Sequence, residues 1–179
     1  MGSPTNNISY ASYEMLQQHP QVNWAIPISL GDAHHGYRVL GTNQQYFDHY
    51  KFGNKQPLVF SQGESFKGVF GAVLGADVAS ALNYKLGDDI VIAHGLGAVS
   101  FQNHDDSPFT VTGILAPTGT PVDKTVHVSL QGIEAMHLPH AQLDSVLELP
   151  DTLTNPAVQP DSVTAVMVGL TSKFATFTL

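Results

Sequence analysis

The segment FTVTGILAPTGTPVDKTVHVSL, residues 109–130, constrains the fold more than any other part of the chain, because it joins two predicted strands through a stiff corner. Pro117 and Pro121 fix their own φ angles and push the residues before them toward extended conformations. Gly119, between them, supplies backbone freedom at the turn. Asp123 is placed to accept hydrogen bonds from backbone N–H groups where the second strand begins. No catalytic pattern accompanies these residues, so we interpret the corner as a joint that fixes the angle between two parts of the molecule.

Charge and composition exclude several classes of protein. The 179 residues include 15 Asp and Glu against 7 Lys and Arg, for a formal net charge of −8. With no basic run, the chain would repel a phosphate backbone, so we expect no nucleic-acid partner. There are no cysteines, which excludes disulfides, thiolate zinc ligands and a cysteine nucleophile. The longest apolar run is far shorter than the roughly 20 residues that span a bilayer.

Hydrophobic periodicity predicts short helices interspersed among strands. Pro27 cannot donate a hydrogen bond to a neighbouring strand, so it indicates a sheet edge or a bulge. The strand at 162–170 is apolar on both faces, which is typical of an interior position. The last residues, KFATFTL, resemble a helix that has just begun, as in a domain cut from a larger protein. The segment 85–93 is predicted to be a turn at Gly87 and Asp88 followed by a buried strand. The other predicted strands are 22–30, 37–42, 69–74, 109–115, 125–130 and 162–170, and the predicted helices are 9–20, 43–50, 77–84 and 131–137.

Histidines are numerous, at nine in the chain, and some of them are candidate metal ligands. His104, Asp105 and Asp106 lie at the tip of a predicted hairpin, and with His94 they could surround a metal ion. Imidazole and carboxylate together suit zinc or nickel. The same residue types also collect at hairpin tips because they favour turns. We therefore name His94, His104 and Asp106 as metal candidates, with zinc as the ion. The alternative prediction is that the domain holds no cofactor.

Two further histidine pairs have weaker patterns. His137 and His140 are three residues apart and could share one helix face, as zinc ligands do. Pro139 disrupts that geometry unless the helix has already ended. His34 and His35 precede a glycine turn. Both pairs are equally explained as exposed residues at a helix end and in a loop.

An enzymatic function has little support in the sequence. No GxSxG motif marks a nucleophile, and TGTP lies between two strands rather than between a strand and a helix. The carboxylate pairs Asp88–Asp89 and Asp105–Asp106 are sequence neighbours whose side chains point apart, which does not suit acid–base catalysis. The GLG at 95–97 has no following lysine or helix. We therefore predict no catalytic residues.

Several segments in order resemble a known family. VLGADVASALNYKLGDDIVIAHG (73–95), FTVTGIL (109–115) and VDKTVHVSL (122–130) are similar to the extracytoplasmic core domain of MacB-like and FtsX-like ABC-transporter permeases. YRVLGTNQQYFDHYKF (37–52) is similar to a further segment of that family, with the match at Gly41 to Phe47. The resemblance covers most of the chain between residues 37 and 137. The hairpin at 94–108 has no counterpart in the pattern, so no particular substrate is carried over.

The resemblance implies a fold and a place in the cell. The fold would be α+β, with a mixed α/β lobe from residues 1–55 and 119–179 and an inserted β-rich lobe from residues 56–118. The parent would be an inner-membrane permease with this segment in the periplasm. Its partners would be a second permease subunit, a separate cytoplasmic ATPase and a periplasmic protein. The corner would then lie where the inserted lobe returns.

Two functions from different classes follow. The first is a non-catalytic domain that transmits conformational change and contacts a periplasmic partner or substrate. The second is a histidine-based module that binds a metal or small ligand, in which His94→Ala or His104→Ala would weaken zinc binding. A free-standing hydrolase is the third hypothesis, and it has the least support in the sequence.

Overall fold

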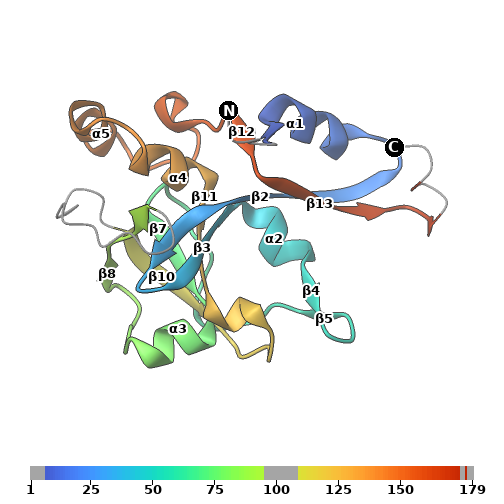
Figure 1. Cartoon of the computed structure of the whole chain (residues 1–179), viewed down its shortest axis with the longest axis horizontal. Helices are drawn as coiled ribbons and strands as arrows, with labels where there is room; N and C mark the ends of the chain where they lie inside the picture. The colour runs from blue at the N-terminus through green and yellow to red at the C-terminus, as the bar shows by residue number, and fades with distance from the viewer. Residues whose placement is uncertain (1–6, 95–108, 174–175, 177–179) are drawn as a thin grey trace, which may run out of the picture.

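The structure is a computed structural model, and it describes residues 7–94, 109–173 and 176. A single mixed sheet runs through the molecule, with helices on both of its sides (Figure 1). Its strands are β2 (Val22–His34), β3 (Tyr37–Thr42), β6 (Phe60–Gly63), β7 (Gly71–Leu74), β8 (Asp89–Ile90), β9 (Ala93–His94), β10 (Phe109–Leu115), β11 (Thr125–Ser129) and β13 (Ala165–Leu170). They follow the order β13-β2-β3-β11-β7-β10-β6, while β8 pairs with β10 and β9 with β2. This confirms the predicted mixed α/β fold.

The helices are short, and several begin at side-chain caps. The hydroxyls of Ser9 and Ser129 and the side-chain oxygen of Asn43 accept backbone N–H groups in the first turns of their helices, as N-caps do. Four of these helices confirm predicted ones, and α5 was missed. The helices are α1 (Tyr10–Gln18), α2 (Gln44–His49), α3 (Ala76–Ala81), α4 (Leu130–Met136) and α5 (His140–Leu147), with 3-10 turns η1 (Pro121–Lys124) and η2 (Pro156–Val158). Small antiparallel pairs join β1 (Ile8–Ser9) to β12 (Ser162–Val163) and β4 (Lys51–Phe52) to β5 (Gln56–Pro57).

Strand β2 connects the two ends of the sheet. Its first part, from Val22 to Ile28, pairs with β13, and its second part, from Ser29 to His34, pairs with β3. The register shifts between Leu30 and Asp32, around Gly31, whose φ is 139°. Among the described residues, β2 pairs at Pro27 with β13 alone, which agrees with the sheet edge that was one of the two predictions for this proline.

A two-residue turn joins β2 to β3. His35 and Gly36 have φ angles of 46° and 82°, so both adopt the left-handed conformation that tight hairpins of type I′ require. His34 and Tyr37 close the ladder on either side. Both histidines were predicted to be exposed residues of a loop. The prediction is confirmed for His35, which lies in the turn, and wrong for His34, which is buried in the sheet.

Strand β13 lies at the edge of the sheet, so the interior position predicted for 162–170 is wrong. Its two faces are apolar for different reasons. Val166 and Val168 pack with Tyr13 of α1 on one face. On the other face the Trp24 ring lies over Gly169, where an added Cβ would come within 2.2 Å of the indole. Helix α1 thus covers one face of β13 and the Trp24 ring covers the other, which explains why both faces are apolar although the strand lies at the edge of the sheet.

Strand β11 is buried along its whole length, at the centre of the sheet. It pairs in parallel with β3 and antiparallel with β7. The main apolar cluster gathers side chains of β3, β7, β10, β11, α3 and α4, and a second one gathers β2, α2, β7 and η1 side chains. The sheet is continuous from β11 to β7, across the boundary drawn between the two lobes at residues 118 and 119. The division into 1–55 with 119–179 and 56–118 stays a prediction.

Gly75 makes the closest backbone approach between α3 and the corner. A Cβ at this position would lie 2.3 Å from the carbonyl oxygen of Val122 and 2.4 Å from that of Asp123. Its φ of −63° suits any residue, so the obstacle is steric. We expect Gly75→Ala to lower the free energy of unfolding by about 2 kcal/mol. Urea denaturation measures this, with the exposed Ser80→Ala in the same helix as control, and a loss below about 0.5 kcal/mol would contradict the close packing.

Candidate functional site

The corner at 116–124 is held by one carboxylate. Asp123 Oδ1 accepts the backbone N–H of Thr118 at 2.7 Å and its hydroxyl at 2.8 Å, and Oδ2 accepts the N–H of Gly119 at 2.8 Å. Asp123 is buried, with only 5% of the residue exposed. This confirms the prediction that Asp123 binds backbone N–H groups, and Gly119 has the positive φ, 70°, expected of the turn.

Threonine hydroxyls complete the corner. Thr118 Oγ1 lies 2.7 Å from Thr120 Oγ1, and the Thr120 hydroxyl caps η1 by accepting the N–H of Val122 at 3.3 Å. The Thr125 hydroxyl donates to the carbonyl oxygen of Pro121 at 2.9 Å. The backbone N–H of Gly75 donates to the carbonyl oxygen of Thr125 at 2.9 Å, which ties β11 to the start of α3. The corner is therefore bonded to β11, and the first residue of β11 is bonded in turn to the residue before α3.

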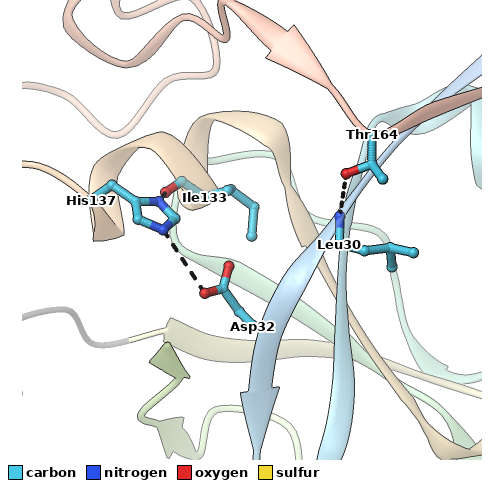
Figure 2. A network of polar contacts seen from close by, with 5 residues as sticks. All are labelled: Leu30, Asp32, Ile133, His137 and Thr164. Atoms are coloured by element: carbon cyan, nitrogen blue, oxygen red, sulfur yellow. Dashed lines mark hydrogen bonds and ion pairs between the residues drawn. The ribbon is translucent and has the colours of Figure 1, made fainter. Parts of the chain in front are cut away.

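A second polar network lies where β2 changes partners (Figure 2). The backbone N–H of Leu30 donates to the hydroxyl of Thr164 at 3.0 Å, and the N–H of Thr164 donates to the carbonyl oxygen of Ile28 at 2.8 Å. Thr164 stands between β12 and β13. It thus binds β2 immediately before the bulge at Gly31, where the pairing with β13 ends.

Beyond the bulge, Asp32 faces α4 (Figure 2). Its Oδ1 lies 3.9 Å from Nε2 of His137, and its side chain is 6% exposed against 50% for His137. The His137 Nδ1 lies 2.6 Å from the carbonyl oxygen of Ile133. A carbonyl oxygen only accepts, so Nδ1 carries a proton and Nε2 is the ring atom turned toward the carboxylate.

His34 connects the end of β2 to the segment after α3. Its Nδ1 donates to the carbonyl oxygen of Val91 at 2.6 Å, and its Nε2 accepts the Tyr84 hydroxyl at 2.8 Å. Burial lowers the pKa of His34, an effect that the hydrogen bond to Val91 partly opposes. At neutral pH the ring is therefore an uncharged part of the core.

Among the described residues, the most buried histidine is one that the sequence did not indicate. His127 on β11 is 0% exposed, with Nδ1 3.1 Å from the carbonyl oxygen of Val73 and Nε2 3.1 Å from the Tyr46 hydroxyl. Burial lowers its pKa to about 4 and raises the pKa of Tyr46. The only signal was its position in TVHVSL, a strand with apolar residues on either side of the histidine.

Of the predicted metal candidates His94, His104 and Asp106, the structure describes only the backbone of His94, so their grouping stays a prediction. His94 ends β9, and its Cα is the register partner of Asp32 on β2. His104, Asp105 and Asp106 lie outside the described residues. His137 caps the C-terminus of α4, whereas His140 begins α5, so the two histidines do not share a helix face. Where the structure describes the chain, no three His, Asp or Glu side chains gather as a metal cage.

The fold is shared with extracytoplasmic domains of ABC-type transporters. The extracellular domain of the transporter YknZ from Gram-positive bacteria superposes with a TM-score of 0.56 at 14% identity, covering 98% of this chain and 79% of that one. The periplasmic region of MacB from Actinobacillus actinomycetemcomitans gives 0.56 at 13% identity, covering 93% of this chain and 66% of that one. Comparison with curated protein sequences finds no match.

The sequence itself shows to which family the chain belongs. The model of the MacB-like periplasmic core domain matches residues 1–172. The chain belongs to this family of extracytoplasmic domains of ABC-transporter permeases, which confirms the resemblance seen at residues 37–137. Among the described helices, none is long and apolar enough to cross a membrane.

Proposed function

We propose that this domain transmits conformational change between the membrane part of its permease and a periplasmic partner or substrate, and that it catalyses no reaction. The parent would lie in the inner membrane as one of two permease subunits driven by a cytoplasmic ATPase. Membership of the MacB-like family supports this context. The role of the domain itself rests on how its sheet is connected.

The observation that carries the proposal is the continuity of β2. Its 13 residues extend about 43 Å at roughly 3.3 Å per residue. The first part of β2 pairs with β13, which lies close in sequence to the last described residues. The second part pairs with β3, and β3 pairs in turn with β11. A displacement at the β13 end is therefore passed along one covalent strand to the centre of the sheet.

The corner supports the same role. It joins β10 to β11 through a turn in which Asp123 fixes the backbone at Thr118 and Gly119. A turn held by charged hydrogen bonds resists bending more than a solvated loop, because opening it exposes buried donors. We infer that the region from β7 to β10 follows β11 as one body.

Spin-label distances in the full permease test this function. The chain has no cysteine, so Met15→Cys on α1 and Val59→Cys before β6, both on exposed side chains, can be labelled once cysteines elsewhere in the parent are replaced. We expect the Met15-to-Val59 label distance within one domain to stay constant through the ATP cycle. The distance between the two Met15 labels of the subunit pair should change on ATP binding.

Either of two results would contradict the proposal. An unchanged distance between the subunits would mean that no motion reaches the domain. A changed distance within one domain would mean that it bends instead of transmitting. A permease pair whose ATPase cannot bind ATP is the control, and both of its distances should stay at the nucleotide-free values.

A further inference from the structure

We propose that a pocket between β10, the segment 64–70 and the carboxylate of Asp151 binds a small organic cation through its N–H groups, with alkylguanidinium ions as the class that fits. The pocket has a volume of about 390 Å³, within the range of small-molecule sites. This site goes beyond the proposed function and does not depend on it. It uses none of the histidines that the sequence analysis singled out.

Two threonines of β10 line the pocket and present hydrogen-bond acceptors to it. Thr110 Oγ1 donates to Asp89 Oδ1 at 3.2 Å, and Thr112 Oγ1 donates to the carbonyl oxygen of Ala72 at 3.4 Å. Carboxylate and carbonyl oxygens only accept, so each threonine has already used its single donor. Both hydroxyl oxygens therefore have only lone pairs left, and a ligand rich in N–H groups matches them.

Asp151 adds a carboxylate whose position is fixed. Its Oδ1 accepts the backbone N–H of Val69 at 2.6 Å. A Cβ built on Gly68 would lie 2.2 Å from Oδ2, so the carboxylate lies directly over the backbone of Gly68, where a side chain would collide with it. Oδ2 accepts no hydrogen bond from the described residues, which leaves this charged acceptor for a ligand.

The charges around the pocket favour a cation. Lys67 Nζ lies 2.9 Å from Glu64 Oε1, so these two exposed side chains neutralise each other and the charge of Asp151 remains. The ring of Phe70, which packs on Phe109 with centroids 5.7 Å apart, also lines the pocket. Aromatic rings attract cations to their faces. A planar guanidinium combines one positive charge with up to five N–H donors, so it meets the ring, the carboxylate and the threonine oxygens together.

Ser65 gives an independent indication of a ligand. It lines the pocket, and among the described residues its Oγ is the one buried side-chain polar atom without a hydrogen-bond partner. A buried hydroxyl in this state destabilises the folded chain, so each such group in a native structure needs an explanation. A bound N–H group would supply the missing partner. The competing explanation is an ordered water that satisfies Ser65, with no role for a ligand.

Isothermal titration of the chain with butylguanidinium chloride at pH 7.5 tests the site. We expect one ligand per chain and a melting temperature that rises with its concentration. Asp151→Asn keeps an acceptor for Val69 but replaces Oδ2 with an NH₂ group, so it should bind about tenfold more weakly. Asp144→Asn is the matched control, because it removes an exposed carboxylate of α5 outside the pocket and should leave the affinity unchanged. Butyltrimethylammonium, with the same charge and no N–H group, should bind about tenfold more weakly than butylguanidinium.

Ser65→Ala separates a ligand from an ordered water. Without butylguanidinium this variant should melt at or above the wild-type temperature, because its hydroxyl has no bond to lose, and it should bind the ligand about threefold more weakly. A lower melting temperature would show that water already satisfies the hydroxyl, and it would overturn the site. Three other results would do the same: no heat and no melting shift at about 10 mM butylguanidinium, equal affinity for the two cations, or unchanged binding in Asp151→Asn. If Asp151→Asn unfolds, as far-ultraviolet circular dichroism would show, Ser65→Ala and the comparison of the two cations decide the case.

Discussion

Replacing Asp123 with alanine is expected to lower the free energy of unfolding by about 3–5 kcal/mol, the largest effect of any substitution considered for this domain. The carboxylate accepts three hydrogen bonds at 2.7–2.8 Å, two of them from backbone N–H groups of Thr118 and Gly119. Alanine leaves these donors without an acceptor in a part-buried turn. Urea denaturation of the chain measures the loss, and the melting temperature should fall by roughly 10 °C.

Two variants make this prediction specific. Asp123→Asn keeps the volume and one accepting oxygen but turns an NH₂ group toward the donors, so it should recover only part of the loss. Lys124→Ala changes the next residue, which is exposed, and should alter the free energy of unfolding by less than about 0.5 kcal/mol. Equal stability of Asp123→Ala and Lys124→Ala would show that the carboxylate does not hold the corner.

The second large effect concerns acid. The pKa of His127 is lowered to about 4 by burial, whereas an unfolded histidine titrates near 6.5. Above pH 6.5 neither state is protonated and the full stability is present. Between pH 6.5 and 4 the unfolded chain takes up a proton that the folded chain excludes, so stability falls with decreasing pH by up to about 1.4 kcal/mol per unit. The total loss is about 3 kcal/mol by pH 4.

Denaturation at pH 7.5 and pH 5.0 measures this effect, for which about 2 kcal/mol is expected from His127 alone. His127→Leu should be less stable at pH 7.5, because the Tyr46 hydroxyl and the Val73 carbonyl lose their partner. It should nevertheless lose less stability between the two pH values than the wild type does. The exposed His140→Gln should retain the full loss, and the same loss in His127→Leu would assign the acid sensitivity to other groups. His34 contributes in the same direction, since burial lowers its pKa as well.

Local signals were enough to predict most of the strands and helices. The Ser9 cap, the alternation in β2 and the rigid corner each depend on residues close together in the sequence. The order of strands could not be predicted in this way. The sequence of β13 is apolar on both faces, but periodicity does not reveal that α1 and Trp24 supply the covering.

The polar contacts of the candidate site also divide into those that nearby residues predict and those that only the fold brings together. Asp123 could be predicted because its partners are four and five residues away. Asp32 could not be placed beside His137, because 105 residues of chain separate them and only the sheet brings β2 and α4 together. The burial of His127 was equally hidden, since its acceptor on β7 and donor on α2 lie far away in sequence.

The pairing of β2 has a consequence for the order in which the chain folds during synthesis. Ile26 faces Met167 in the ladder, 141 residues later. Within this domain the first part of β2 is synthesised well before its partner β13. Until then Val22 to Ile28 presents an unpaired apolar edge, the kind of surface on which strands aggregate and to which chaperones bind. Pro27, which removes one hydrogen-bond donor from that edge, makes it a poorer template while it waits.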